Sequence, residues 1–218
     1  MKDIDTLRAI IDHQNAVAKK QFFDKKGNRC WIGVRTLQGF QQRMLLDGGG
    51  GVEAMPRYNR HDAVVFYGVD GEPEVWVDPN FANYRGAFAA MVKRHYDFSL
   101  SESQVADLDI DHVFARSAAI AGNVGYVRLA GIYKGANRAR GAHEDRLGPP
   151  FNAHGLAAAS VADFCKINSN YLLLGDKGNE AAGVPMMVAS GVFEGLIPKD
   201  QATQLITRGT NEVLAAFK

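Results

Sequence analysis

The dipeptide Asp70-Gly71 lies between two runs of apolar and β-branched residues, Ala63–Val69 and Glu74–Val77. An Asp-Gly pair readily adopts the left-handed backbone of a tight turn. Between two such runs it is therefore a strong signal for a β-hairpin. The sequence thus predicts two antiparallel strands over these residues.

Helical spacing of apolar residues flanks this hairpin on both sides. Residues 3–20 place apolar side chains on one face of a helix, and Pro79 stands at a favourable first position for a helix that ends near His95. The alternation of helices and strands predicts an α+β fold rather than a doubly wound parallel sheet. Further elements are expected as helices at 101–108, 156–167 and 199–217, and as a short strand at 171–174.

Composition narrows the class of protein. Apolar residues make up 46% and charged residues 22% of 218, which is typical of a globular chain that buries a core. The two cysteines, Cys30 and Cys165, form no C-x-x-C pair and are expected to be reduced thiols. No leader-like segment or long apolar run is present, so we expect a cytoplasmic protein without a membrane span. Gly48–Gly51 is expected to be a loop, since no Gly-Lys-Ser/Thr follows it.

Residues 109–117, D-I-D-H-V-F-A-R-S, combine two groups that phosphodiester hydrolysis requires. The carboxylate of Asp111 can hold a divalent metal ion. The neighbouring His112, when neutral, can accept a proton from an attacking water. This pair is the centre of the candidate site.

Asn137 offers a side-chain oxygen that suits Mg²⁺ or Mn²⁺. The run 125–133, G-Y-V-R-L-A-G-I-Y, can form the second strand of a hairpin with 109–117. A short helix that begins after Asn137 would then return this residue to the Asp111-His112 strand. The expected arrangement is a ββα unit.

Positive charge is concentrated in the same segment. Between Asp111 and Arg146 there are six basic residues against three acidic ones, whereas the net charge of the whole chain is +1. Basic side chains here can bind phosphates on either side of the scissile bond. The expected substrate-binding residues are Arg116, Arg128, Lys134, Arg138 and Arg140.

The runs D-H-V-F-A-R-S and N-R-A-R-G resemble the motif of the HNH endonucleases, a ββα-metal family. The match covers residues 109–145. The resemblance implies that His112 is the general base and that Asp111 and Asn137 bind the metal, with His143 as a possible third ligand. It also places Arg140 at the position of the family's common lysine. One divalent ion is implied, Mg²⁺ or Mn²⁺, with Ni²⁺ or Zn²⁺ as alternatives.

From this resemblance we expect a metal-dependent endonuclease that acts on DNA rather than RNA. It would serve as a bacterial or phage defence nuclease, or as an antibacterial toxin with an inhibitor (immunity) protein. The HNH-like core at about 107–146 is expected to be embedded in one integrated domain, 1–218. Its flanks, 1–100 and 150–218, match no family that we recognise.

Two alternatives stay open. Tyr126 stands about where the motif usually has its middle asparagine, which favours a catalytically degenerate HNH-like module that binds nucleic acid or another protein. Alternatively, the chain is an enzyme of different chemistry whose active residues lie in the flanks. His61 with Asp62, or the glycine run, would then carry the reaction.

Overall fold

The computed structural model describes residues 2–24, 29–100, 108–133, 151–159, 163–164 and 167. In this part of the chain the helices are α1 (Lys2–Phe22), α2 (Leu37–Asp47), α3 (Tyr84–Tyr96) and α4 (Arg116–Ala121). The strands are β1 (Trp31–Val34), β2 (Gly51–Ala54), β3 (Ala63–Tyr67), β4 (Pro73–Val77), β5 (Leu108–His112), β6 (Tyr126–Tyr133) and β7 (Leu156–Ala158).

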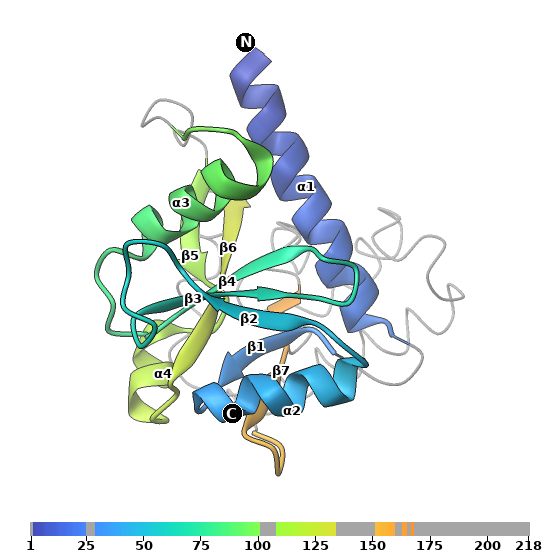
Figure 1. The fold of residues 1–218 in the computed structure, drawn as a ribbon, viewed down its shortest axis with the longest axis vertical. Coiled ribbons are helices and arrows are strands. Elements are labelled where there is room, and N and C mark those ends of the chain that lie inside the picture. The colour runs from blue at the N-terminus through green and yellow to red at the C-terminus, as the bar shows by residue number, and fades with distance from the viewer. Residues whose placement is uncertain are drawn as a thin grey trace, which may run out of the picture.

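Every described strand pair is antiparallel. The main sheet has the order β2-β3-β4-β6-β1-β7, and β5 pairs with β6 outside this path. The long strand β6 joins the two parts. Its first residues, Tyr126–Arg128, pair with β1 and β4, whereas Leu129–Tyr133 pair with β5. The candidate strand β5 is therefore attached to the sheet through the second half of β6 (Figure 1).

The two faces of β3 bury different clusters. Val64 and Phe66 pack with Phe40 of α2, while Ala63 and Val65 pack with residues of α1 and α3. Because side chains alternate along a strand, this division places α2 on one face and α1 with α3 on the other. The β5 residues Leu108 and Ile110 join the cluster that contains α3.

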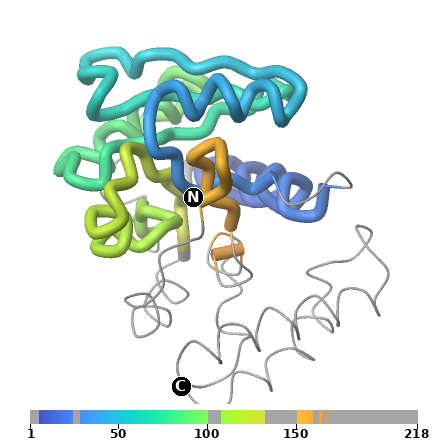
Figure 2. Tube along the Cα trace, turned by 90° about the horizontal axis from the view of Figure 1, so that it is seen from below, coloured from blue at the N-terminus to red at the C-terminus, as the bar shows by residue number. Residues whose placement is uncertain are grey.

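The C-terminal half of α1 supports a third cluster. Phe22 stacks on Phe164 with ring centroids 4.4 Å apart, and Ala18 and Ala159 lie in the same cluster. The segment that begins at Phe151, orange in Figure 2, accordingly lies beside α1, in dark blue. The long first helix is thus fixed at both halves by apolar packing.

Several expectations from the sequence are confirmed. The fold mixes helices with antiparallel strands, the N-terminal helix covers the expected residues, and β3 and β4 form the expected hairpin. Gly48, Gly49 and Gly50 lie outside the regular elements with positive φ, so the glycine run is a loop up to the start of β2 at Gly51.

Other expectations differ from the structure. The helix expected at 156–167 is wrong at its start, because Leu156–Ala158 pairs with β1 as strand β7. The helix expected from Pro79 begins only at Tyr84. Residues 78–80 instead form a turn in which the Asn80 N–H donates to Asp78 Oδ1. Leu108, expected as the end of a helix at 101–108, is instead the first residue of β5. The rest of that helix and the elements expected at 171–174 and 199–217 lie outside the described residues.

Within the part of the chain that the structure describes, no helix is both long enough and apolar enough to cross a membrane.

Candidate functional site

Asp111 and His112 are the last two residues of β5. The His112 side chain is only 3% exposed and lies on the buried side of the strand with Leu108 and Ile110, whereas that of Asp111 is 27% exposed. The two side chains still approach each other, with His112 Nδ1 3.8 Å from Asp111 Oδ1. The same carboxylate oxygen accepts a hydrogen bond of 2.8 Å from the His112 backbone N–H. The expected pair is therefore adjacent in space as well as in sequence.

Tyr84, the first residue of α3, packs on the imidazole of His112. The two ring centroids are 4.6 Å apart and the rings are tilted by 51°. This contact helps to explain why His112 is buried at the end of a strand. No local pattern in the sequence predicts this contact, because it depends on how α3 packs beside β5 (Figure 1).

The second strand expected for the ββα unit is β6. Asp111 pairs with Ala130 and His112 with Leu129 in the antiparallel register. Helix α4, which the sequence did not predict, lies between the two strands in the chain. The chain continues from the end of β6 at Tyr133 into the segment that carries the remaining expected residues. Those residues lie outside the described part of the structure: Lys134, Asn137, Arg138, Arg140 and His143.

The expected metal ligands are thus described only in part. Asp111 is described, whereas Asn137 and His143 are not. Across the described ranges, no three His, Cys, Asp or Glu side chains gather in a group that could hold a metal ion. A metal site that contains Asp111 would therefore need further ligands from outside the described residues.

Arg116 opens α4 at the surface. Its Nε donates a hydrogen bond of 2.8 Å to the carbonyl oxygen of Pro79, in the connection that leads to α3. The side chain is exposed, so its location is compatible with the expected phosphate contact.

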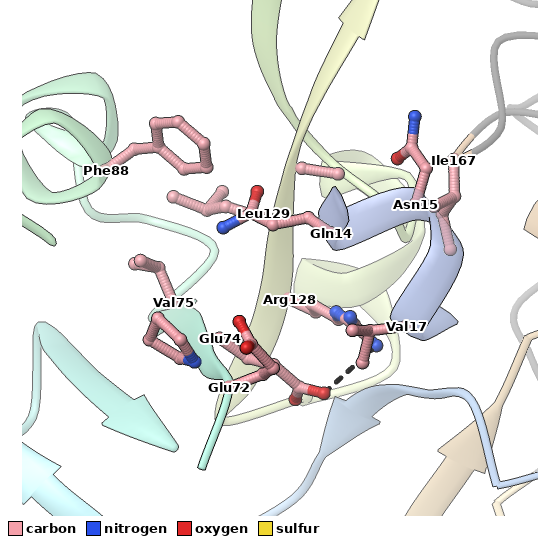
Figure 3. Close-up of a pocket in the computed structure, with 12 residues that line it drawn as sticks. Gln14, Asn15, Val17, Glu72, Glu74, Val75, Phe88, Arg128, Leu129 and Ile167 are labelled. Atoms are coloured by element: carbon pink, nitrogen blue, oxygen red, sulfur yellow. Dashed lines mark ion pairs between the residues drawn. The ribbon is translucent and has the colours of Figure 1, made fainter. Parts of the chain in front are cut away.

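Arg128 has a different environment from the one expected. Its side chain is 6% exposed, and Nη1 lies 3.3 Å from Glu74 Oε1 of β4 and 2.9 Å from Gln21 Oε1 of α1. Figure 3 shows Arg128 and Glu74 facing each other in a narrow pocket beneath α1, with Phe88 on its far side. The structure therefore gives Arg128 a buried structural role, and its guanidinium is not presented to a substrate at the surface.

The network around Glu74 includes a second arginine, Arg43 of α2, which is fully buried. Arg43 Nη1 and Nη2 lie 2.5 Å and 3.0 Å from the two Glu74 oxygens, and Trp76 Nε1 donates to Oε2 at 3.1 Å. Burial alone raises the pKa of Glu74, but Arg128 and Arg43 hold it at about 2. The carboxylate is thus charged and has partners for both oxygens.

Tyr126, which the resemblance sets near the motif's middle asparagine, is 4% exposed and belongs to the core. Its ring lies 5.5 Å from that of Phe40, and its hydroxyl donates to the Arg60 carbonyl oxygen at 3.1 Å. This hydroxyl ties β6 to the connection between β2 and β3. Tyr126 therefore has a packing role in this chain.

His61 and Asp62, the flank residues that an enzyme of different chemistry would use, belong to no group of possible metal ligands in the described part of the chain. His61 is exposed, and its backbone N–H donates a hydrogen bond of 3.0 Å to Asn59 Oδ1 in a local turn. The Asp62 backbone carbonyl accepts a bond from Asp78 N–H at 2.9 Å, which fixes the start of β3 beside the end of β4. Local turn geometry accounts for both residues.

Comparisons of the chain with protein-family models, with curated protein sequences and with solved structures give no match.

Proposed function

We propose that this protein is a divalent-metal-dependent nuclease of the HNH type that hydrolyses phosphodiester bonds, with DNA as the preferred substrate. The observation that carries the proposal is the position of Asp111 and His112, 3.8 Å apart at the end of β5. Strand β5 pairs with β6, and β6 leads directly into the segment with Asn137. Two antiparallel strands followed by the helix that the sequence predicts after Asn137 would give the order of a ββα unit.

In this proposal each residue has a distinct task. His112 accepts a proton from the attacking water. Asp111, Asn137 and His143 are the residues that would hold the metal ion, which would supply Lewis acidity at the phosphate oxygens. Lys134, Arg138 and Arg140 would bind phosphates that flank the scissile bond.

Tyr84 sets a condition on this chemistry. Its ring packs on the imidazole of His112, with centroids 4.6 Å apart, and we propose that the Tyr84 side chain moves to admit the attacking water. Tyr84 is half-buried as the first residue of α3 and packs against the apolar cluster that includes Phe88. Movement of this side chain is therefore part of the proposal.

The cleavage test uses supercoiled plasmid, linear DNA and total RNA with the purified protein in Mg²⁺, Mn²⁺, Ni²⁺ or EDTA. The proposal expects cleavage that requires a metal and stops in EDTA, with DNA cut faster than RNA. Cleavage that persists in EDTA would exclude the metal-dependent mechanism.

A second candidate is a non-catalytic nucleic-acid-binding or protein-binding module with an HNH-like scaffold. The burial of His112 beneath Tyr84 and the packing of Tyr126 favour it. Mn²⁺ titration by calorimetry separates the two candidates. An active site should bind Mn²⁺ and lose it in Asn137→Ala, whereas wild-type protein that binds no Mn²⁺ and cuts no nucleic acid would support the second candidate.

A further inference from the structure

Two exposed arginines, Arg85 and Arg116, stand at the beginnings of α3 and α4. Neither forms an ion pair with a carboxylate in the described part of the chain. Both helices border the end of β5, because α3 contacts β5 and α4 begins shortly after His112. The chain therefore has two guanidinium groups available near the candidate site.

Direct contacts connect each arginine to the surroundings of His112. The Arg85 guanidinium lies over the ring of Tyr84, 5.0 Å from its centroid, and that ring packs on His112 at 4.6 Å. Arg116 is held through Nε by the carbonyl oxygen of Pro79, in the connection that leads into α3. This bond uses the Nε–H of the guanidinium and leaves the Nη groups for another acceptor.

The opposite end of α3 differs. Lys93 pairs with Asp97 at 2.7 Å, and Arg94 pairs with Glu53 at 2.9 Å, so the positive charges there are compensated. Near the beginning of α3, Asp78 uses Oδ1 to accept the Asn80 N–H within its own turn. The uncompensated arginines of this helix pair are thus on the His112 side.

We propose that Arg85 and Arg116 form a phosphate clamp that holds the backbone of a nucleic acid across the end of β5. A planar guanidinium binds phosphate oxygens with two parallel hydrogen bonds, and a stacked or anchored arginine loses little side-chain freedom when it does so. The inference rests on the proposed function and deepens it, because Arg85 lies outside the segment that resembles the HNH motif. The clamp also replaces the phosphate contact expected of the buried Arg128.

The test measures binding without cleavage. Fluorescence anisotropy of a fluorescein-labelled 20-bp DNA duplex is recorded in EDTA at several salt concentrations for wild type, Arg85→Gln, Arg116→Gln and the double variant. Each phosphate contact contributes roughly 0.9 to the slope of log K against log salt. Each single variant should therefore lower the slope by about one, and the double variant by about two. Lys93→Gln, which removes a charge from the other end of α3, should leave the salt slope near the wild-type value.

Arg116→Lys shows whether a reduced slope in Arg116→Gln comes from the lost charge or from misfolding. It keeps the positive charge and should therefore keep most of the slope. Wild-type slopes in Arg85→Gln and Arg116→Gln, in a protein that binds DNA, would overturn the clamp and leave the nuclease proposal intact. Reduced slopes in a protein that cuts nothing with any metal would support the clamp and contradict the nuclease proposal. A wild-type protein that binds no DNA would overturn the clamp.

Discussion

The guanidinium of Arg43 and the carboxylate of Glu74 form a bidentate ion pair in the interior, with N–O distances of 2.5 Å and 3.0 Å. Arg128 completes the network from β6, and Gln21 donates to Glu74 Oε1 at 2.9 Å from α1. Three elements far apart in the chain, α1, α2 and β6, are therefore fixed to the same carboxylate on β4. The network therefore joins both helices to the sheet that carries the candidate site.

Replacing Glu74 by glutamine should destabilise the protein strongly. The substitution removes the negative charge that the buried Arg128 and Arg43 share and leaves Arg43 paired with Asp47 alone, which costs about 3–5 kcal/mol. Glu53→Gln is the matched control, since Glu53 pairs with Arg94 at the surface, where such pairs contribute about 1 kcal/mol or less. Urea unfolding measures both changes. Equal losses of unfolding free energy in the two variants would contradict the structural role of the network.

The same carboxylate predicts a specific acid dependence. Its pKa is about 2 in the folded protein against an ordinary value of 4.5, so the unfolded chain takes up a proton first as the pH falls. The stabilisation from Glu74 is complete above about pH 4.5 and is lost as the pH drops toward about 2. The difference in unfolding free energy between wild type and Glu74→Gln should therefore shrink over this window. A difference that stays constant from pH 6 to about pH 2.5 would contradict the assignment.

Cys30 should be unreactive in the folded protein. Burial raises the pKa of its thiol from 9.0 to about 11, despite the opposing effect of Arg128. Because the thiolate is the reacting species, two pKa units lower the alkylation rate about 100-fold, and the lack of exposure lowers it further. The alkylation rates of Cys30 in the native and the urea-unfolded protein can be compared by iodoacetamide labelling at pH 8 in a Cys165→Ser background, with mass spectrometry as the readout. Rapid labelling of the native protein would show that Cys30 is accessible.

Gly131 allows α1 to lie close to β6. A Cβ atom at this position would overlap with Ile11 Cδ1, in a fully buried side chain. Gly131→Ala should therefore lower the free energy of unfolding by about 1–3 kcal/mol. Gly51→Ala is the control, because a Cβ there meets no atom within 4 Å. Adding Ile11→Val removes the overlapping methyl group and should restore part of the loss, whereas an additive double variant would exclude this contact as the cause.

Local signals in the sequence predicted the local parts of the fold. Asp70-Gly71 identified the hairpin of β3 and β4, with the turn bond from Gly71 N–H to the Gly68 carbonyl at 3.0 Å. Tertiary pairing overrode propensity at Leu156–Ala158, where an Ala-rich run adds a strand to the edge of the sheet beside β1. The residues of that run do not themselves indicate that one edge of β1 is available for pairing.

The candidate site was predictable to a similar extent. Asp111 and His112 are neighbours in any fold, and their pairing with β6 followed from the run 125–133. The cover that Tyr84 places over His112 and the burial of Arg128 against Glu74 could not be predicted, because both arise from elements distant in sequence. A count of basic residues does not distinguish a buried arginine from an exposed one.

The most direct measurement compares plasmid cleavage by His112→Ala with cleavage by His61→Ala, at equal protein concentration and in the metal that supports the highest activity. His61 is an exposed histidine outside the candidate site, and circular dichroism verifies that each variant is folded. Loss of a general base should reduce the rate about 10²- to 10⁴-fold in His112→Ala and leave His61→Ala at the wild-type rate. Equal cleavage by the wild type and a folded His112→Ala variant would contradict the assignment of His112 as the catalytic base.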